Sequence, residues 1–345
     1  MRLLFCFPLL VSIACAHSAH GIHPKAVLHQ AAGVRSVAKG DLDRAAGQFS
    51  LALEYEPKMV EATNGLGLVA HARGDDATAE FYFRGAIALN DEFAEAHLNW
   101  GSILLSRDEL EEALVSFCRA LAIDPGFFAA RYAKAEALLR LGRLEDARWE
   151  LAKLCEIDPK SVQAHASYAL VLARLGRLAL AETENQKALA LDPEHPTSLR
   201  ARAEILRRAG DYKSAILWLR KLLDRNPGGV EDRISLAHCL VAANRPDDAL
   251  VEAKPLEGMA PHKAEAPFVL AYASLRLGHL NEAILAAERA LKLRPIFPEA
   301  RLVYAEALLQ RGNSKEGKQA LSRFLEEAPP SMEAERKIAL DYLRR

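Results

Sequence analysis

The stretch "LAIDP", Leu121–Pro125, ends a phrase that returns later in the chain as "CEIDP", "LALDP" and "LKLRP". Eight prolines and one aspartate mark the ends of such phrases, each 34 residues after the last, and no insertion interrupts the period across 26–331. The nine markers are Pro57, Asp91, Pro125, Pro159, Pro193, Pro227, Pro261, Pro295 and Pro329. A fixed period of this length is the sequence signature of a repeat architecture.

Other columns of the repeat keep the same period. Two columns hold only Gly or Ala in all nine copies, one running from Gly33 to Ala305 and the other from Ala45 to Gly317. A third column holds residue types that tolerate a left-handed backbone. Its members are Gly40, Gly74, Asp108, Gly142, Gly176, Gly210, Asn244, Gly278 and Gly312. The period therefore does not depend on proline alone.

These columns predict two helices in every repeat. The first helix ends at the glycine column, where a left-handed residue caps it. The second ends before the proline, which disfavours helix in the residue that precedes it. The small columns let the two helices pack closely and antiparallel, and stacked pairs bury an apolar face that one pair cannot bury alone. Large apolar residues are expected to fill the flanks of the small columns: Phe49, Phe83, Phe117, Leu151 and Leu219.

The pattern resembles the tetratricopeptide repeat family, whose unit is a helix–turn–helix of 34 residues. The resemblance covers nine tandem repeats at 26–331 and implies an all-α solenoid of antiparallel helix pairs that forms a right-handed superhelix. Segment 332–345 is predicted to be a C-terminal capping helix, in which Ile338 and Leu343 cover the last repeat. One departure is clear, because polar residues such as Arg131 largely replace the family's large aromatic residue near the start of the first helix.

One repeat is irregular, because Pro255 falls inside its predicted second helix. Proline at that place removes a backbone hydrogen bond and kinks or ends the helix. Pro246 and Pro267 differ from it, since they fall in the first turn of a helix, where proline is tolerated. We therefore predict a local weak point near 254–262.

Composition and motifs exclude several classes of function. The chain has 45 basic and 46 acidic residues, whereas a general nucleic-acid binder usually shows a strong basic excess. The sequence contains no phosphate-binding glycine loop, HExxH, paired CxxC or nucleophile elbow. We predict that the protein is not an enzyme and takes no cofactor, no small-molecule substrate and no nucleic acid.

We also predict no metal site. Three cysteines are scattered through the repeats and are interpreted as small buried apolar residues: Cys118, Cys155 and Cys239. Four histidines near the start could approach one ion, but their spacing matches no structural zinc site, and a polar tether explains them as well. These are His17, His20, His23 and His29.

The first residues predict an export signal at 1–15 and a tether at 16–25. Behind Arg2, a short apolar run ends in small residues, as in a signal peptide, and it is too short to span a bilayer. Two cleavage sites stay open: after Ala16, or before Cys15 as in a bacterial lipobox, although Ser12 departs from that pattern. Both place the mature protein in the periplasm, and a lipidated Cys15 would anchor it to the outer membrane.

Binding is predicted on the first helices, which line the concave face in this family. Side chains at the second, fifth, ninth, twelfth and thirteenth repeat positions usually point into that face. The candidate partner-binding residues in these columns are Tyr132, Glu136, Arg140, Arg174, Arg200, Glu204, Arg207, Arg208, Phe268, Tyr272 and Arg276.

Three of these arginines stand at the thirteenth position of consecutive repeats. Arg140, Arg174 and Arg208 predict a ladder that could grip acidic side chains or a chain terminus through bidentate hydrogen bonds. The alternative is ordinary ion pairing, because Glu136 and Glu204 stand four residues before Arg140 and Arg208. Arg174 has no acid at that spacing, so it is the most available of the three.

The resemblance implies a function in assembly. Exported members of the family help to build envelope machines such as type IV pilus secretins, motility complexes and polysaccharide export systems. The first hypothesis is a non-catalytic scaffold that holds segments of other cell-envelope proteins in its concave groove, with Tyr132, Phe268 and Tyr272 as anchors. The alternatives are a self-associating structural solenoid, or an accessory module of a polysaccharide or peptidoglycan enzyme system.

Overall fold

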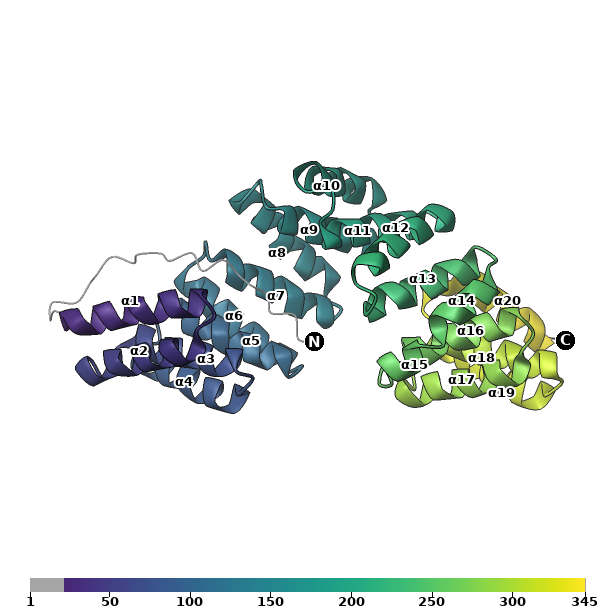
Figure 1. The fold of residues 1–345 in the computed structure, drawn as a ribbon. Helices are drawn as coiled ribbons and strands as arrows, with labels where there is room; N and C mark the ends of the chain where they lie inside the picture. The colour runs from purple at the N-terminus through teal and green to yellow at the C-terminus, as the bar shows by residue number, and fades with distance from the viewer. Residues whose placement is uncertain (1–21, 345) are drawn as a thin grey trace. The chain divides into compact units, whose positions relative to one another are not determined.

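A computed structural model describes residues 22–344 of the 345-residue chain, and every regular element in that range is helical (Figure 1). The all-α architecture predicted from the repeat is therefore confirmed. The predicted export signal at 1–15, its Cys15 and most of the predicted tether lie outside the described residues. Within 22–344, no helix is both long and apolar enough to cross a membrane.

The chain divides into two compact units, Met1–Pro159 and Lys160–Arg345, which we call unit 1 and unit 2. In unit 1, the first helices of the repeats are α1 (Pro24–Ala38), α3 (Val60–Ala72), α5 (Ala94–Ser106) and α7 (Phe128–Arg140). The second helices are α2 (Leu42–Tyr55), α4 (Asp76–Leu89), α6 (Leu110–Ile123) and α8 (Leu144–Ile157). Helix α1 thus begins two residues before the predicted start of the first repeat.

Unit 2 continues the same alternation. Its first helices are α9 (Val162–Arg174), α11 (Pro196–Arg208), α13 (Val230–Ala242), α16 (Glu265–Arg276) and α18 (Pro298–Arg311). Its second helices are α10 (Leu178–Leu191), α12 (Tyr212–Arg225), α14 (Pro246–Ala253) continued by α15 (Leu256–Met259), α17 (Leu280–Leu293) and α19 (Ser314–Glu327). A 3₁₀ turn (Pro330–Met332) and the final helix α20 (Glu333–Arg344) follow.

The helix ends lie where the sequence columns predict them. All nine members of the glycine column have a positive φ, including the two that are not glycine, Asp108 at 65° and Asn244 at 59°. Each second helix, or α15 in the interrupted repeat, ends two residues before its marker. The left-handed residue turns the chain back after the first helix, and the marker stops the second.

In most repeats the core is a large side chain set against small ones. The Phe49 ring lies so close to Gly33 of its own repeat and Gly65 of the next that a Cβ atom at either glycine would lie 2.6 Å from it. Phe83 and Phe117 each lie equally close to one glycine of their own repeat, Gly67 and Gly101. The column from Ala45 to Ala283 is fully buried. The close helix approach predicted from the small columns is confirmed.

Most successive first helices contact one another within each unit, as α1 does α3 and α9 does α11. Helices α11 and α13 are joined through Arg200 and Asp232. The second helices pack between first helices and make at most marginal contacts with one another in the described part of the chain. The first helices therefore form one face of each unit, which we call the inner face. The second helices form the outer face.

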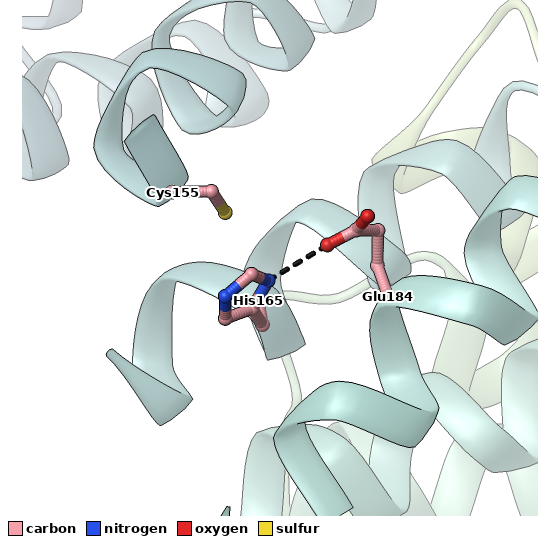
Figure 2. Close-up of side chains that lie close together, drawn as sticks. All are labelled: Cys155, His165 and Glu184. Atoms are coloured by element: carbon pink, nitrogen blue, oxygen red, sulfur yellow. Dashed lines mark hydrogen bonds and ion pairs between the residues drawn. The ribbon is translucent and has the colours of Figure 1, made fainter. Parts of the chain in front are cut away.

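Polar bridges largely replace the family's aromatic residue near the start of the first helix. Arg131 donates from Nη1 to Glu150 of α8 at 2.6 Å and from Nη2 to the carbonyl of Pro125 at 2.7 Å. In the next repeat, His165 Nδ1 lies 2.7 Å from Glu184 Oε2 of α10 (Figure 2). These bridges join the first helix to its own second helix. The arginine also ties it to the preceding turn.

The predicted irregularity at Pro255 is present as a break in the helix. Helix α14 ends at Ala253, and only the four-residue α15 continues it after the proline. The neighbouring second helices α12 and α17 each run for 14 residues. Since proline cannot donate a backbone hydrogen bond, the interruption follows from this one residue.

The capping helix α20 forms, but it uses only one of the two residues that we expected, Leu343. Ile338 is 50% exposed, so its predicted place over the last repeat is wrong. Ala339 is buried there instead, with Met332 and Leu343 packed beside it. Arg336 donates to the carbonyls of residues 325 and 328 at 2.7 Å and so caps the end of α19. A small residue at the contact lets α20 approach closely.

Asn185 is an exception within the core. It stands eight residues before its marker, where most other repeats place a large apolar residue such as Phe49, Leu151 or Leu219 and two place alanine. Its side chain is fully buried, and neither its amide oxygen nor its amide nitrogen makes a hydrogen bond. Burying an amide without partners destabilises a fold, so we expect Asn185 to lower the stability of its repeat.

We predict that Asn185→Leu will raise the free energy of unfolding by about 1–3 kcal/mol, because it removes the unpaired amide and restores the apolar side chain of this column. Urea unfolding of the two proteins measures the difference. The matched control, Leu219→Asn, should lower the stability. An Asn185→Leu protein no more stable than the parent would contradict the assignment.

Candidate protein-binding surface

The predicted binding residues all lie on first helices, but they divide between the two units. Tyr132, Glu136 and Arg140 are on α7 of unit 1, and the other eight are on α9, α11 and α16 of unit 2. The arginine ladder predicted from the thirteenth column therefore has members in both units.

In unit 1, Arg140 is held by its own repeat array. Its Nη1 donates to the carbonyl of Leu105 at 2.7 Å, and its Nη2 pairs with Asp108 at 2.7 Å. The ion pair between Glu136 and Arg140 expected from their spacing is therefore wrong. Partial burial raises the pKa of Glu136, and the charge of Arg140 offsets this only in part. Arg140 ties the end of α7 to the end of α5.

The same contact recurs in unit 2, where Arg276 Nη2 donates to Asn244 Oδ1 at 3.3 Å. Asp108 and Asn244 are the non-glycine members of the left-handed column, and each accepts from an arginine 32 residues later. Asp and Asn tolerate the left-handed backbone, and the arginine contact ties each of these turns to the next first helix. Arg140 and Arg276 therefore have a structural role.

On α11, two arginines share one carboxylate. Arg207 donates two hydrogen bonds of 2.7 Å to the carboxylate of Glu204, one from Nε and one from Nη2. Arg208 donates a third from its Nε at 2.9 Å. Burial would raise the pKa of Glu204, but the bonds and charges of the two arginines outweigh it and lower that pKa. The expected pair of Glu204 with Arg208 is thus confirmed, and one positive charge is left in excess.

Arg200 has a different partner. Its Nε and Nη2 bond both oxygens of Asp232 on α13, at 2.6 and 2.7 Å. These bonds raise the pKa of Arg200. Asp232 is only 3% exposed, so the pair fixes α11 against α13. The sequence reasoning missed Asp232, which stands where most repeats have alanine.

Arg174 makes no hydrogen bond and no ion pair within residues 22–344. Partial burial holds the pKa of its guanidinium below the usual range, and the charges of Arg200 and Arg208 act in the same direction, against Glu204. The sequence prediction that Arg174 is the most available of the three arginines agrees with this placement. The surface of α9 and α11 around it carries an excess of positive charge.

An aromatic group continues the inner face toward α16. The His238 ring lies 6.0 Å from Tyr272 and 6.4 Å from Phe268, and Phe268 packs on Phe297 at 4.9 Å. Phe268 is only 9% exposed, so it belongs to the core and offers little surface as an anchor. Tyr272 and His238 are half-buried. Burial, and next the charge of Arg207, lower the pKa of His238.

The sequence reasoning did not single out His238, although the signal for it was present. His238 stands at the ninth position of its repeat, one of the columns expected to point into the groove. Its ring lies near Tyr272 of α16, and it is close enough to Arg207 of α11 for that charge to lower its pKa. We call Arg174, Arg207, Arg208, His238 and Tyr272 the inner-face patch. Its chemistry suits an acidic segment that also carries an apolar or aromatic side chain.

Comparison with known families gives matches along most of the chain. One family model described as tetratricopeptide repeat matches residues 31–89, 78–127 and 169–230. A second model of the same description matches 104–175, 206–266 and 274–336. The chain matches no curated protein sequence.

Several solved structures share the fold. A tetratricopeptide repeat protein of Parabacteroides merdae is 17% identical with a TM-score of 0.60, over 72% of this chain and 98% of that one. The hetero-tetramer Cut9–Hcn1 of the APC/C is 18% identical with a TM-score of 0.63, over 77% of this chain and 52% of that one. The pilF protein of Pseudomonas aeruginosa is 18% identical with a TM-score of 0.54, over 61% and 95%. Identities this low establish the fold alone.

The two kinds of inner-face arginine should respond differently to truncation. Arg200→Ala should lower the free energy of unfolding by about 2–3 kcal/mol, because it leaves the buried carboxylate of Asp232 without a partner. Arg174→Ala should change it by less than about 0.5 kcal/mol. Urea unfolding compares both with the parent protein. Equal losses in the two variants would show that Arg174 is also structural.

Proposed function

The chain belongs to the tetratricopeptide repeat family, and we propose that it is a scaffold of the bacterial cell envelope that holds an acidic segment of a partner on its inner-face patch. The fold supports a role in protein–protein interaction, and the family is generally non-catalytic. The observation that carries the proposal is Arg174, a guanidinium without a partner in the described residues, beside Arg207 and Arg208, which share one carboxylate.

The patch offers two kinds of contact to one partner. Arg174 can bind a carboxylate through a bidentate pair of hydrogen bonds without first breaking an internal ion pair, which makes the contact more favourable. Arg207 and Arg208 add positive charge that attracts an acidic segment from solution. Tyr272 and His238 give an apolar or aromatic side chain a surface to pack on. An extended segment that crosses α9, α11, α13 and α16 would use both.

The cellular setting is a second part of the proposal. The apolar run at the start of the chain supports export, either with cleavage after Ala16 or with lipid on Cys15. Lipidation would hold the scaffold on the outer membrane from the periplasmic side, since each buried methylene contributes about 0.8 kcal/mol. The assemblies proposed for it are type IV pilus secretins, motility complexes and polysaccharide export systems.

Charge reversal at the patch tests the binding assignment. Arg174→Glu combined with Tyr272→Ala should reduce crosslinking to envelope proteins at least tenfold, equivalent to about 1.4 kcal/mol, because it repels the acidic segment and removes its aromatic contact. The matched control is Arg220→Glu, which reverses an exposed arginine of α12 on the outer face. Capture that survives the double change, or that fails equally in the control, would remove the patch as the binding site.

The mass of the mature N-terminus tests the setting. Mass spectrometry of the protein from bacterial envelopes should find a chain that begins at a lipidated Cys15 or at a free His17. A chain that retains residues 1–14 would contradict export through a cleaved signal.

A further inference from the structure

The inner face of unit 2 carries a carboxylate that has no partner among residues 22–344. Glu306 of α18 is half-buried and stands at the ninth position of its repeat, the position that Glu204, His238 and Tyr272 hold in the three repeats before it. Nothing in that range donates a hydrogen bond to Glu306 or forms an ion pair with it. In contrast, Glu204 is bound by two arginines of its own helix.

The cation nearest in effect to Glu306 is already engaged. Arg276 Nη2 donates to Asn244, in the turn after α13. Partial burial raises the pKa of Glu306, and the charge of Arg276 offsets this only in part. A carboxylate in this state gains from a further cation, because partial burial strengthens the attraction between opposite charges.

The surroundings of Glu306 favour a cation with an aliphatic stem. Leu302 lies four residues before it and Leu309 three after it, so the three side chains share one side of α18. Both leucines are half-buried and pack on the core at the end of the array. The methylene stem of a lysine or arginine can pack on such leucines while its charged group reaches the carboxylate.

Tyr272 of the inner-face patch lies one repeat before Glu306. The two residues hold the same position of successive repeats, and their helices α16 and α18 contact each other. Packed helices lie roughly 8–10 Å apart, a distance that an extended chain covers in about three residues. A segment whose apolar or aromatic side chain packs on Tyr272 therefore brings a residue about three places further along to Glu306.

We propose that the segment held on the inner-face patch carries a lysine or arginine about three residues from its apolar or aromatic side chain, and that this cation binds Glu306. The inference rests on the proposed function and extends its surface by one repeat, from α16 to α18. The acidic end of the segment lies at Arg174 and its basic end at Glu306, on opposite sides of Tyr272. A segment that is acidic throughout is disfavoured, because Glu306 repels it.

The two charged ends set the length of the segment. From α9 to α18 it crosses four steps between first helices, roughly 40 Å in all. Helices α11 and α13 are held together on this path by the bonds between Arg200 and Asp232. An extended chain needs about 12 residues for the distance. Charges this far apart are largely screened from each other in salt, so both stay available to the protein.

Peptides displayed on phage test the pairing, because their sequences report what the surface prefers. Random peptides of about 16 residues, longer than the path, are selected on the purified full chain. The parent should enrich peptides with an acidic residue toward one end and, toward the other, a lysine or arginine about three residues from an apolar or aromatic side chain. On Glu306→Lys, an acidic residue should replace that base at the same spacing. The matched control, Glu326→Lys, changes an exposed acid of α19 on the outer face and should leave the preference unchanged.

Fluorescence anisotropy of the most enriched peptide, made synthetically, measures the size of the effect. Glu306→Gln, which removes the charge and nearly keeps the shape, should weaken binding about tenfold, equivalent to about 1.4 kcal/mol. Glu306→Lys should weaken it further. Changing the base of the peptide to glutamate should restore binding to Glu306→Lys and weaken binding to the parent.

The outcomes separate this inference from the proposed function. Enriched peptides that lack the base, or binding that Arg174→Glu abolishes while both changes at Glu306 leave it intact, would overturn the inference and leave the proposed function standing. Binding that survives Arg174→Glu and is lost in Glu306→Lys would overturn the acidic contact of the proposed function instead. A parent that enriches no peptide, or peptides that no inner-face change affects, would overturn both.

Discussion

Most repeats depend on one contact, the large side chain of a second helix set against small residues of the first helices. Phe49 shows it most clearly, because its ring lies where a Cβ atom of Gly33 or Gly65 would otherwise be. One side chain thereby joins its own repeat to the next, and the close approach lets stacked pairs share a core. Where the contact is replaced, the effect is local. Asn185 puts an unpaired amide in the same place and weakens one repeat.

The polar contacts of the arginines show which of them have a structural role. Some stabilise the array: Arg131 bridges helix to turn, Arg140 ties the end of α7 to Asp108 after α5, and Arg200 fixes α11 to α13 through a buried carboxylate. Against that background Arg174 stands out on the same inner face, with no partner in the described residues. Because Arg140 and Arg200 are used inside the array, Arg174 is left as the inner-face arginine that can bind a partner without breaking an internal pair.

The repeat gives the protein two faces that can act separately. First helices form the inner face, where arginines and half-buried aromatic rings lie together in unit 2. Second helices form the outer face, where each unit carries a row of apolar side chains. Because helix pairs contact mainly their neighbours, residues on either face can change without disturbing the core.

The sequence by itself determined the helix pairs, their ends and the small columns of the core, because these follow from residue types at a fixed period and from constraints that act within a few residues. The break at Pro255 was predictable for the same reason. Only the tertiary structure decided that Arg140 pairs with Asp108, 32 residues away, and not with Glu136 in its own helix. It also decided that α20 packs through Ala339 while Ile338 is exposed. A long side chain such as Arg140 pairs with an acceptor that the stacking of repeats brings close to it. A short helix such as α20 packs through the face that has a small residue at the contact. Neither choice is set by neighbours in the sequence.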